Sequence, residues 1–322
     1  MNDLPLVTVA HLCFNNAKYI CESIESVQAS SYLNLEHLVI DDGSNESEFE
    51  LLQNFLSKDK FKGVQLHKNE VNLGIPASQN RAVELANGKY FIGAISDDIM
   101  FPEKILDDVM CLEGLDESVV AVFSVAEFFH KTKGDCADEQ MGRIAGTLDC
   151  SEIVLSSEEF GRIVFEKNII PAPTVMLRTS WLKLSPYDST YFLEDLPKWV
   201  DLIEGKHSIV HRSKVSIYYR RLLHSYSSQD RKDEIPYRIQ LDVIRCRLRL
   251  IKALGIDADI SDLLRNGISI LQDGAEHDRD ALLQLIEFKE RKGWLYTFAK
   301  VFRNRLVLRL AWGVSKVFSS KV

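Results

Sequence analysis

Two adjacent carboxylates, Asp97 and Asp98, follow a nearly uncharged run at residues 90–95 whose composition is typical of a buried strand. Neighbouring carboxylates repel each other unless water, a cation or hydrogen-bond donors surround them. Most carboxylates in proteins are exposed, so a solvated turn is the simplest interpretation of this pair. The pair becomes a candidate cation site if other polar segments of the chain meet it.

The elements that would position this pair alternate between strand-like and helix-like stretches over the first hundred residues. Apolar, β-rich runs predict strands at residues 6–12, 36–40, 64–67 and 90–95. Three helices are predicted between these strands. The first follows Asn16, which can cap it, and the second covers residues 46–56. The third runs from Pro76 to Ala86, with Gly88 placed to end it. This alternation predicts an α/β fold with a doubly wound, mostly parallel sheet.

Three polar segments fall at the ends of predicted strands, at residues 13–16, 41–44 and 96–98. Ligands of open α/β sheets bind outside the carboxyl ends of the strands. We therefore expect the three segments to converge on one crevice, which would place Asp97 and Asp98 beside a ligand.

Composition and charge narrow the class of protein. The 322 residues are 46% hydrophobic and 27% charged, as in soluble globular proteins. The net charge is −8, and from Arg291 onward there are eight Lys or Arg and no acid, which leaves −16 on the rest of the chain. That balance argues against nucleic acid as a partner.

Cysteine usage and hydropathy predict a cytoplasmic protein. The six cysteines show no CxxC pair and no metal-ligand spacing, so we expect reduced thiols. We expect no cleaved signal peptide, because no basic stretch precedes the first apolar run, and no membrane span, because no run of eighteen apolar residues occurs.

The motifs in order resemble the family 2 glycosyltransferases with the GT-A fold, in particular those that assemble bacterial surface polysaccharides such as O-antigen and capsule. They are HLCFNNAKYICESIESV, LVIDDGS, NLGIPASQNRAVELANGKY and SDD, then PAPTVMLRTSWL, LEDLPKW and YYRRLLHSYS. The resemblance covers roughly residues 5–228. It implies an inverting glycosyltransferase that moves a hexose from a nucleotide-diphosphate donor, expected to be a UDP-sugar, to a glycan or lipid-linked saccharide.

The resemblance also implies a set of donor-binding residues: Leu12, Phe14, Asp42, Asn80, Asp97 and His224. Phe14 would stack on the base, and simple core packing is the alternative. Asp42 would accept a hydrogen bond from the uracil ring, unless its carboxylate only binds its own turn. His224 would reach the diphosphate or the metal, with a surface histidine as the alternative. Leu12 stands where the family usually has Pro, and Gln79 where many members have Arg.

Asp98 matches the metal ligand of the family, and Asp97 would contact ribose or a metal-bound water. Carboxylate oxygens suit Mn²⁺ or Mg²⁺, which would offset the charge of a diphosphate. Ile95 stands where the common form of the motif has a further Asp.

Asp195, in the pair Glu194-Asp195, matches the catalytic base of the family, which removes the proton of the acceptor hydroxyl. The alternative is a pair of acids that merely favours a helix N-terminus. Trp199 then lies on that helix, and we expect it in the core.

Residues 229–322 are predicted to form a helical extension of a catalytic domain at residues 1–228, packed on that domain or on a second subunit of a homo-oligomer. Tyr237, Leu241, Ile244, Leu248 and Ile251 form one helical stripe, and further helices are expected at residues 261–271 and 280–292. The basic, aromatic tail from residue 293 is typical of a helix that lies on the inner face of the cytoplasmic membrane. A terminal helix packed on the core is the alternative.

Two other classes of protein stay open. A sugar-1-phosphate nucleotidyltransferase normally has a glycine-rich loop after its first strand, whereas the first glycine here is Gly43. A non-catalytic module that binds nucleotide sugars would not need Asp98 and Asp195.

Overall fold

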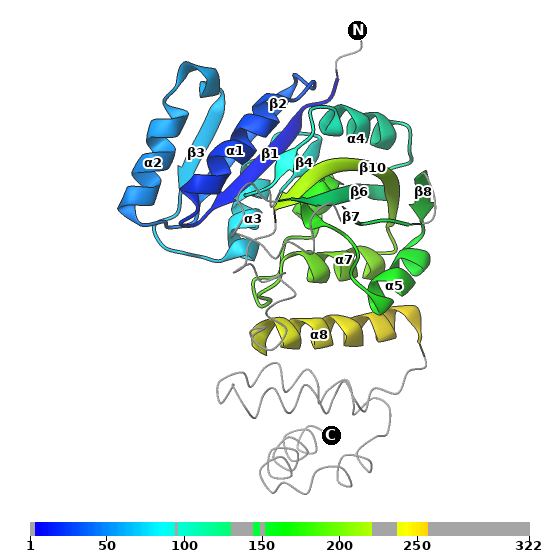
Figure 1. The fold of residues 1–322 in the computed structure, drawn as a ribbon. Helices are drawn as coiled ribbons and strands as arrows, with labels where there is room; N and C mark the ends of the chain where they lie inside the picture. Colours follow the sequence, from blue (N-terminus) through cyan, green and yellow to red (C-terminus); the bar gives the residue numbers. More distant parts are fainter. Residues whose placement is uncertain (1–3, 94–95, 130–143, 149–151, 221–236, 257–322) are drawn as a thin grey trace, which may run out of the picture. The chain divides into compact units, whose positions relative to one another are not determined.

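The computed structural model describes residues 4–93, 96–129, 144–148, 152–220 and 237–256. Ten strands of these residues form one mixed sheet, in the order β3-β2-β1-β4-β9-β6-β10-β5 (Figure 1). The path comprises β3 (Val64–Lys68), β2 (Leu35–Asp41), β1 (Val7–Cys13), β4 (Tyr90–Ile92), β9 (Met176–Arg178), β6 (Val119–Phe129), β10 (Ser208–Arg220) and β5 (Ile99–Met100). Off this path, β7 (Ile144–Ala145) pairs with β6 and β8 (Glu152–Leu155) pairs with β10.

The N-terminal half of the sheet is parallel, as predicted. Strand β1 pairs in parallel with β2 and β4, and β2 pairs in parallel with β3. Strand β9 runs antiparallel to both of its neighbours, and β10 then runs parallel to β6. The mostly parallel sheet of an α/β fold is therefore confirmed.

Helices cover both faces of the sheet. They are α1 (Ala17–Gln28), α2 (Glu46–Leu56), α3 (Ile75–Leu85), α4 (Lys104–Glu113), α5 (Ser157–Glu166), α6 (Thr179–Leu184), α7 (Asp195–Glu204) and α8 (Tyr237–Leu254), with short 3-10 turns at Asp59–Phe61 and Ala172–Thr174. The strand period of two explains the two faces. On β1, Val7 and Val9 pack with residues of α1 and α4, whereas Ala10 and Leu12 pack with residues of α3, α5, α6 and α7.

Two predicted element ends differ from the structure. The strand expected at residues 90–95 ends at Ile92. At the next residue the backbone passes the Gln79 amide so closely that a Cβ on Gly93 would lie 2.6 Å from its oxygen. Gly88 does not end α3, which stops at Leu85. A Cβ on Gly88 would lie 2.5 Å from the Thr8 nitrogen, so this glycine is required for close packing on β1.

The predicted cap of α1 is also different. Asn16 occupies the N-cap position, but its side chain makes no capping bond within the part of the chain that the structure describes. Glu48 of α2 instead accepts the Ala17 N–H at 2.9 Å. Helix α2 has its own cap, because the Asn45 side chain accepts the Glu48 N–H at 3.0 Å. The N-termini of α1 and α2 are therefore tied together at the carboxyl edge of the sheet.

The predicted stripe on α8 is confirmed at Leu241, Ile244, Leu248 and Ile251, which are all buried, while the side chain of Tyr237 lies outside the description. The helix packs on α5 and α7 (Figure 1). The chain divides into a compact unit of residues 1–258, which includes α8, and a second unit of residues 259–322. That second unit, with the helices and the basic tail predicted there, lies outside the described residues.

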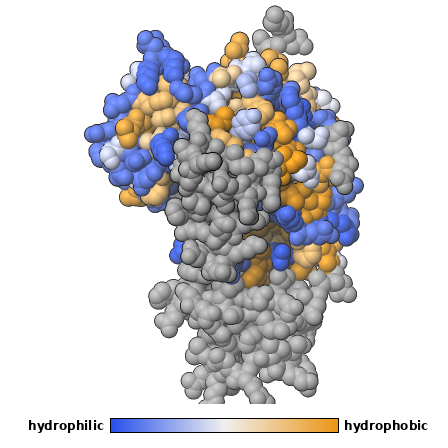
Figure 2. All heavy atoms as spheres, in the orientation of Figure 1, coloured by the Kyte–Doolittle hydropathy of each residue, from blue (hydrophilic) through white to orange (hydrophobic). Residues whose placement is uncertain are grey.

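The surface of the described elements is uneven. Figure 2 shows mainly hydrophilic residues over α2 and β3 and a band of hydrophobic residues over β6 and β10. The four cysteines among the described residues, Cys13, Cys21, Cys111 and Cys246, are free thiols. None of the described helices combines the length and the apolar character that a bilayer crossing requires.

Candidate active site

The three polar segments predicted to converge do meet at the carboxyl ends of β1, β2 and β4. The Asn15 N–H donates to Ser44 Oγ at 2.9 Å, and the Asn45 N–H donates to Asn15 Oδ1 at 3.0 Å. The Ser96 hydroxyl donates to the Leu12 carbonyl at 2.8 Å. The loops after β1, β2 and β4 are therefore joined by direct hydrogen bonds.

Asp42 lies at this edge and fastens the loop that leads to α3. Its Oδ1 accepts the Asn69 side-chain N–H at 2.7 Å and the Leu73 N–H at 2.9 Å, and its Oδ2 accepts the Gly74 N–H at 2.9 Å. An ionised carboxylate has about four lone-pair sites, so one acceptor site on Oδ2 remains for a ligand. The turn-binding role weighed for this residue belongs to its neighbour, because Asp41 Oδ2 accepts the Ser44 N–H at 3.2 Å.

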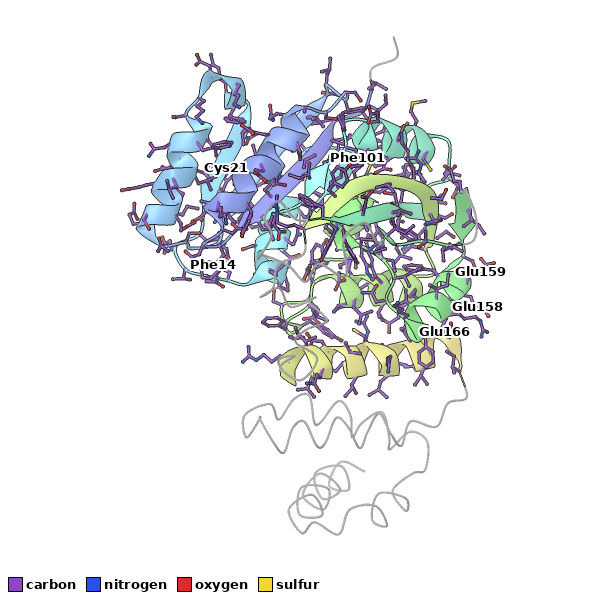
Figure 3. All side chains as sticks on the ribbon, viewed as in Figure 1. Phe14, Cys21, Phe101, Glu158, Glu159 and Glu166 are labelled. Carbon is purple, nitrogen blue, oxygen red and sulfur yellow. The ribbon has the colours of Figure 1, made fainter. Side chains whose placement is uncertain are left out.

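Phe14 and Leu12 have opposite environments. Phe14 is 48% exposed at the end of β1, so core packing is excluded for it (Figure 3). Leu73, in the loop held by Asp42, and Ile75, the first residue of α3, are likewise exposed apolar side chains. Leu12 is buried in the core and reaches the site only through its carbonyl. Phe14 is thus available to a planar apolar group.

Asp97 and Asp98 are both held by Arg220, the last residue of β10. Asp98 is buried and its Oδ1 accepts the Arg220 N–H at 2.7 Å. The Arg220 Nε–H donates to the Asp97 carbonyl at 2.7 Å, and its guanidinium forms an ion pair with Glu22 of α1 at 2.7 Å. Burial raises the pKa of both aspartates, and the charge of Asp97 raises the pKa of Asp98 further.

The donor set of this pair fits a divalent cation that arrives with an anionic ligand. Burial and mutual repulsion disfavour two ionised carboxylates, and a cation between them would relieve both effects. Among the described residues, no group of three His, Cys, Asp or Glu side chains could hold a metal ion by itself. The remaining ligands would therefore come from a diphosphate and from water, as is usual for Mg²⁺.

Asp195 is the first residue of α7, and Glu194 is its N-cap. Asp195 Oδ2 accepts the Asn168 side-chain N–H at 3.1 Å, and Oδ1 accepts the Leu196 N–H at 2.6 Å. The packed surroundings raise the pKa of Asp195. They raise the pKa of Glu194 to about 8, with the charge of Asp195 as a second cause. Burial of two neighbouring carboxyl groups is thus the main cause of both pKa shifts.

A small cavity of about 20 Å³, with room for about one water molecule, lies beside Asp195. Its lining includes Gly93, which begins the loop to Asp97, Gln79 of α3, Asp195 and Trp199. Within the described residues, Gln79 Oε1 and Trp199 Nε1 are buried without a hydrogen-bond partner. Unpaired buried polar atoms are costly, so these two atoms mark a place suited to hydroxyl groups of a ligand.

The remaining predicted residues are Asn80, Trp199 and His224. The Asn80 side chain is engaged with the Tyr187 backbone, since it donates to the carbonyl at 2.8 Å and accepts the N–H at 2.7 Å. Asn80 thus holds the segment that precedes Asp195, and direct contact with a donor stays a prediction. Trp199 is buried in the core, as predicted. His224 lies outside the described residues.

Arg220, Asn69 and Asn168 were missed by sequence reasoning. Arg220 lies 122 residues after Asp98, and no spacing or period links the two. Its one signal is its position in the YYRR segment, next to the histidine that drew attention instead.

Comparison with known proteins gives a family match over part of the chain and a fold. The family model described as glycosyl transferase family 2 matches residues 8–138. An uncharacterized glycosyltransferase of Methanocaldococcus jannaschii is 27% identical over 204 residues, which cover 62% of this chain. The matched segment spans 66% of that protein, just under two thirds of its length.

Two solved structures share the fold. S. aureus TarS in complex with UDP-GlcNAc aligns with a TM-score of 0.58 at 15% identity and covers 88% of this chain and 79% of TarS. The mannosyltransferase PcManGT from Pyrobaculum calidifontis, in complex with GDP-Man and Mn²⁺, aligns with a TM-score of 0.52 at 13% identity, over 98% of this chain and 81% of that one. At these identities the likeness shows a GT-A type fold.

Proposed function

We propose that this chain, whose residues 8–138 belong to glycosyltransferase family 2, transfers a sugar from a nucleotide-diphosphate donor to a saccharide acceptor with inversion at the anomeric carbon. One observation carries the proposal. A single cavity is lined both by Gly93, at the start of the Asp97–Asp98 loop, and by Asp195. The start of the Asp97–Asp98 loop and the Asp195 carboxylate are therefore neighbours, so a donor bound over the loop would lie near that carboxylate.

The donor that these residues suit best is a UDP-sugar. The exposed Phe14 ring can stack on the base, and the remaining acceptor site of Asp42 can take the N–H of a uracil. The fold neighbour TarS was solved with UDP-GlcNAc, which supports this choice, whereas PcManGT was solved with GDP-Man.

Asp98 and Asp97 would hold Mn²⁺ or Mg²⁺ together with the diphosphate, and PcManGT contains Mn²⁺. The ion would supply electrostatic stabilisation of the leaving nucleoside diphosphate. In this chain the Arg220 N–H holds the Asp98 carboxylate, and Ser96 ties the loop to β1. These contacts keep the metal-binding oxygens at the edge of the crevice.

Asp195 is proposed as the general base. The acceptor hydroxyl attacks the anomeric carbon, its proton passes to the Asp195 carboxylate, and the bond from the anomeric carbon to the diphosphate oxygen breaks. Asn168 and the Leu196 N–H orient that carboxylate. Burial and the charge of Asp195 both raise the pKa of Glu194, which favours a neutral Glu194 beside a charged Asp195.

A panel of nucleotide sugars tests the proposal. The full-length protein is incubated with each donor, Mn²⁺ or Mg²⁺ and a mixture of saccharide acceptors, and mass spectrometry quantifies the released nucleoside diphosphate and the glycosylated product. We expect equal amounts of both from at least one UDP-sugar. Pyrophosphate formed from a sugar 1-phosphate and a nucleoside triphosphate would show a nucleotidyltransferase instead, and binding without turnover of any donor would show a non-catalytic module.

A further inference from the structure

Helix α8 contributes a buried carboxylate to the segment that leads into α7. Asp242 is 3% exposed, and its Oδ2 accepts the Phe192 N–H at 2.7 Å and the Leu193 N–H at 2.9 Å. These two amides lie directly before Glu194 and Asp195. Hydrogen bonds to a buried charged acceptor are stronger than neutral ones, so Asp242 fixes this stretch of backbone firmly.

Arg245, one turn further along α8, holds the same segment. Its guanidinium donates to the Thr190 carbonyl and to Thr190 Oγ1, both at 3.1 Å, and lies 3.8 Å from the centre of the Tyr191 ring. It also pairs with Asp242 at 3.6 Å. Four consecutive residues, 190–193, are therefore held by one ion pair on α8.

The other end of the segment is fastened by different elements. Asn80 of α3 holds Tyr187, and the Lys198 ammonium of α7 donates to the Ser185 and Pro186 carbonyls at 2.7 and 2.9 Å. Residues 185–194 form no helix or strand, so their course depends on these contacts. The α8 contacts are the ones nearest to Asp195 along the chain.

We propose that Asp242, supported by Arg245, is a positioning residue that sets the place of the Asp195 carboxylate by anchoring the backbone at residues 190–193. The inference rests on the proposed role of Asp195 as base. Because α7 begins at Asp195, a shift of residues 192–193 moves its first turn and with it the carboxylate. A misplacement of about 1 Å at a reacting group can cost on the order of 10²-fold in rate. The donor loops lie on β1, β2 and β4 and should be unaffected.

The test compares Asp242→Ala and Asp242→Asn with Leu250→Ala in the full chain. Leu250 is buried on the same helix, eight residues or about 12 Å further along, and serves as a control for loss of helix packing. Three quantities are measured: kcat for transfer, affinity for UDP with Mn²⁺ by calorimetry, and hydrogen exchange of the Phe192 and Leu193 amides. The exchange measurement does not depend on activity.

We expect Asp242→Ala to speed exchange at both amides at least tenfold and to lower kcat ten- to a hundredfold, with nucleotide affinity unchanged. Asp242→Asn keeps an acceptor oxygen and should have a smaller effect on amide exchange and on kcat. Leu250→Ala should lower the melting temperature without a matching loss of kcat. Faster exchange with full kcat, or a kcat loss equal to that of the control, would overturn the positioning role. Fast exchange in the unaltered protein would overturn the anchor itself, and absence of transfer by that protein would instead contradict the proposed function.

Discussion

Arg220 connects three parts of the candidate site at the scale of single residues, two through its guanidinium and one through its backbone N–H. Its side chain is only 3% exposed and binds Glu22 of α1 and the Asp97 carbonyl, while its backbone N–H binds Asp98. The ring of Tyr19 lies 5.1 Å from the guanidinium and that of Phe129 lies 4.6 Å from it, both within the range of cation–π attraction. The planar, forked guanidinium can make its hydrogen bonds and ring contacts together, whereas the ammonium of a lysine cannot.

Arg220→Lys should therefore weaken metal-dependent nucleotide binding. The variant keeps the charge but loses the fork, so we expect affinity for UDP with Mn²⁺ to fall about tenfold, the effect of one charge-assisted hydrogen bond. Calorimetry of the full chain measures this directly.

Arg212→Lys is the matched control. Arg212 lies eight residues earlier on the same strand and pairs with Asp107, Asp108 and Glu152. Arg212→Lys should lower the stability of the protein as Arg220→Lys does, but it should leave nucleotide affinity unchanged. If the two variants weaken binding equally, or neither does, then Arg220 is only a structural arginine.

At the scale of elements, a chain of hydrogen-bonded side chains, buried except for Gln28, joins α1 to β1 and β2. Gln28 Nε2 lies 2.7 Å from His37 Nδ1, His37 Nε2 lies 3.0 Å from His11 Nδ1, and His11 Nε2 lies 3.0 Å from Ser23 Oγ. With Gln28 as the first donor, neutral rings complete the chain by donating from each Nε2–H. The chain is complete only when both rings are neutral. Burial accordingly lowers the pKa of His37 to about 4 and that of His11 well below its usual range.

This chain predicts that the protein loses stability in mild acid. The unfolded state takes up a proton near the ordinary histidine pKa of about 6.5, while the folded state does so only near 4, so stability is full above 6.5 and falls as the pH drops. Between pH 7.5 and 5 the loss from His37 alone should be about 2 kcal/mol. Urea unfolding at both pH values measures it.

The variant His37→Gln lacks the titrating ring and should show an acid loss smaller by about that amount. His67→Gln, on β3, serves as the comparison because it leaves the His11–His37 chain intact. An unchanged acid loss in His37→Gln would show that His37 is not held neutral.

The sequence predicts some elements well and others not at all. The difference follows from the distance along the chain between an element and the residues that it pairs with. Strands β1 and β2 and helices α1 to α3 were placed to within a few residues, because each has its own apolar period and turn residues. Strands β5 and β9 have two and three residues and pair with distant partners, so no local pattern marks them.

The candidate site also has a part that the sequence predicts and a part that it does not. The convergence of the three loops follows from the parallel topology alone. The contact of Asp98 with Arg220, and that of Asp242 with residues 192–193, depend on chain crossings that periodicity does not encode. Asn80 shows the limit at a single residue, since its amide suits a ligand and a backbone carbonyl equally well.

At the scale of the whole molecule, charge is separated along the chain. The tail from Arg291 carries eight basic residues and no acid, together with six aromatic side chains, whereas the rest of the chain has a net charge of −16. This tail lies outside the described residues. We propose that it attaches the protein to the anionic inner face of the cytoplasmic membrane, where a lipid-linked acceptor would be found.

Binding to vesicles tests this attachment. Each basic residue near an anionic surface contributes about 1 kcal/mol, so Arg303, Arg305 and Arg309 changed together to Gln should reduce binding to phosphatidylserine vesicles at least tenfold. Lys58, Lys60 and Lys62, which are exposed beside α2, changed to Gln alter the net charge equally and should have little effect. Equal effects of the two triple variants, or no binding by the unaltered chain, would contradict the proposal.

The central claim is that one crevice binds a nucleotide donor on the Asp97–Asp98 side and activates the acceptor on the Asp195 side. Asp195→Asn tests it most directly, with Asp201→Asn as control, because Asp201 lies on the same helix and binds Lys198 and Arg249 instead. In the donor assay, Asp195→Asn should lower turnover by on the order of 10²–10⁴, the usual contribution of a general base, with affinity for UDP and Mn²⁺ unchanged. Asp201→Asn should keep its turnover. Full turnover by Asp195→Asn, or a collapse of its nucleotide affinity, would contradict the account.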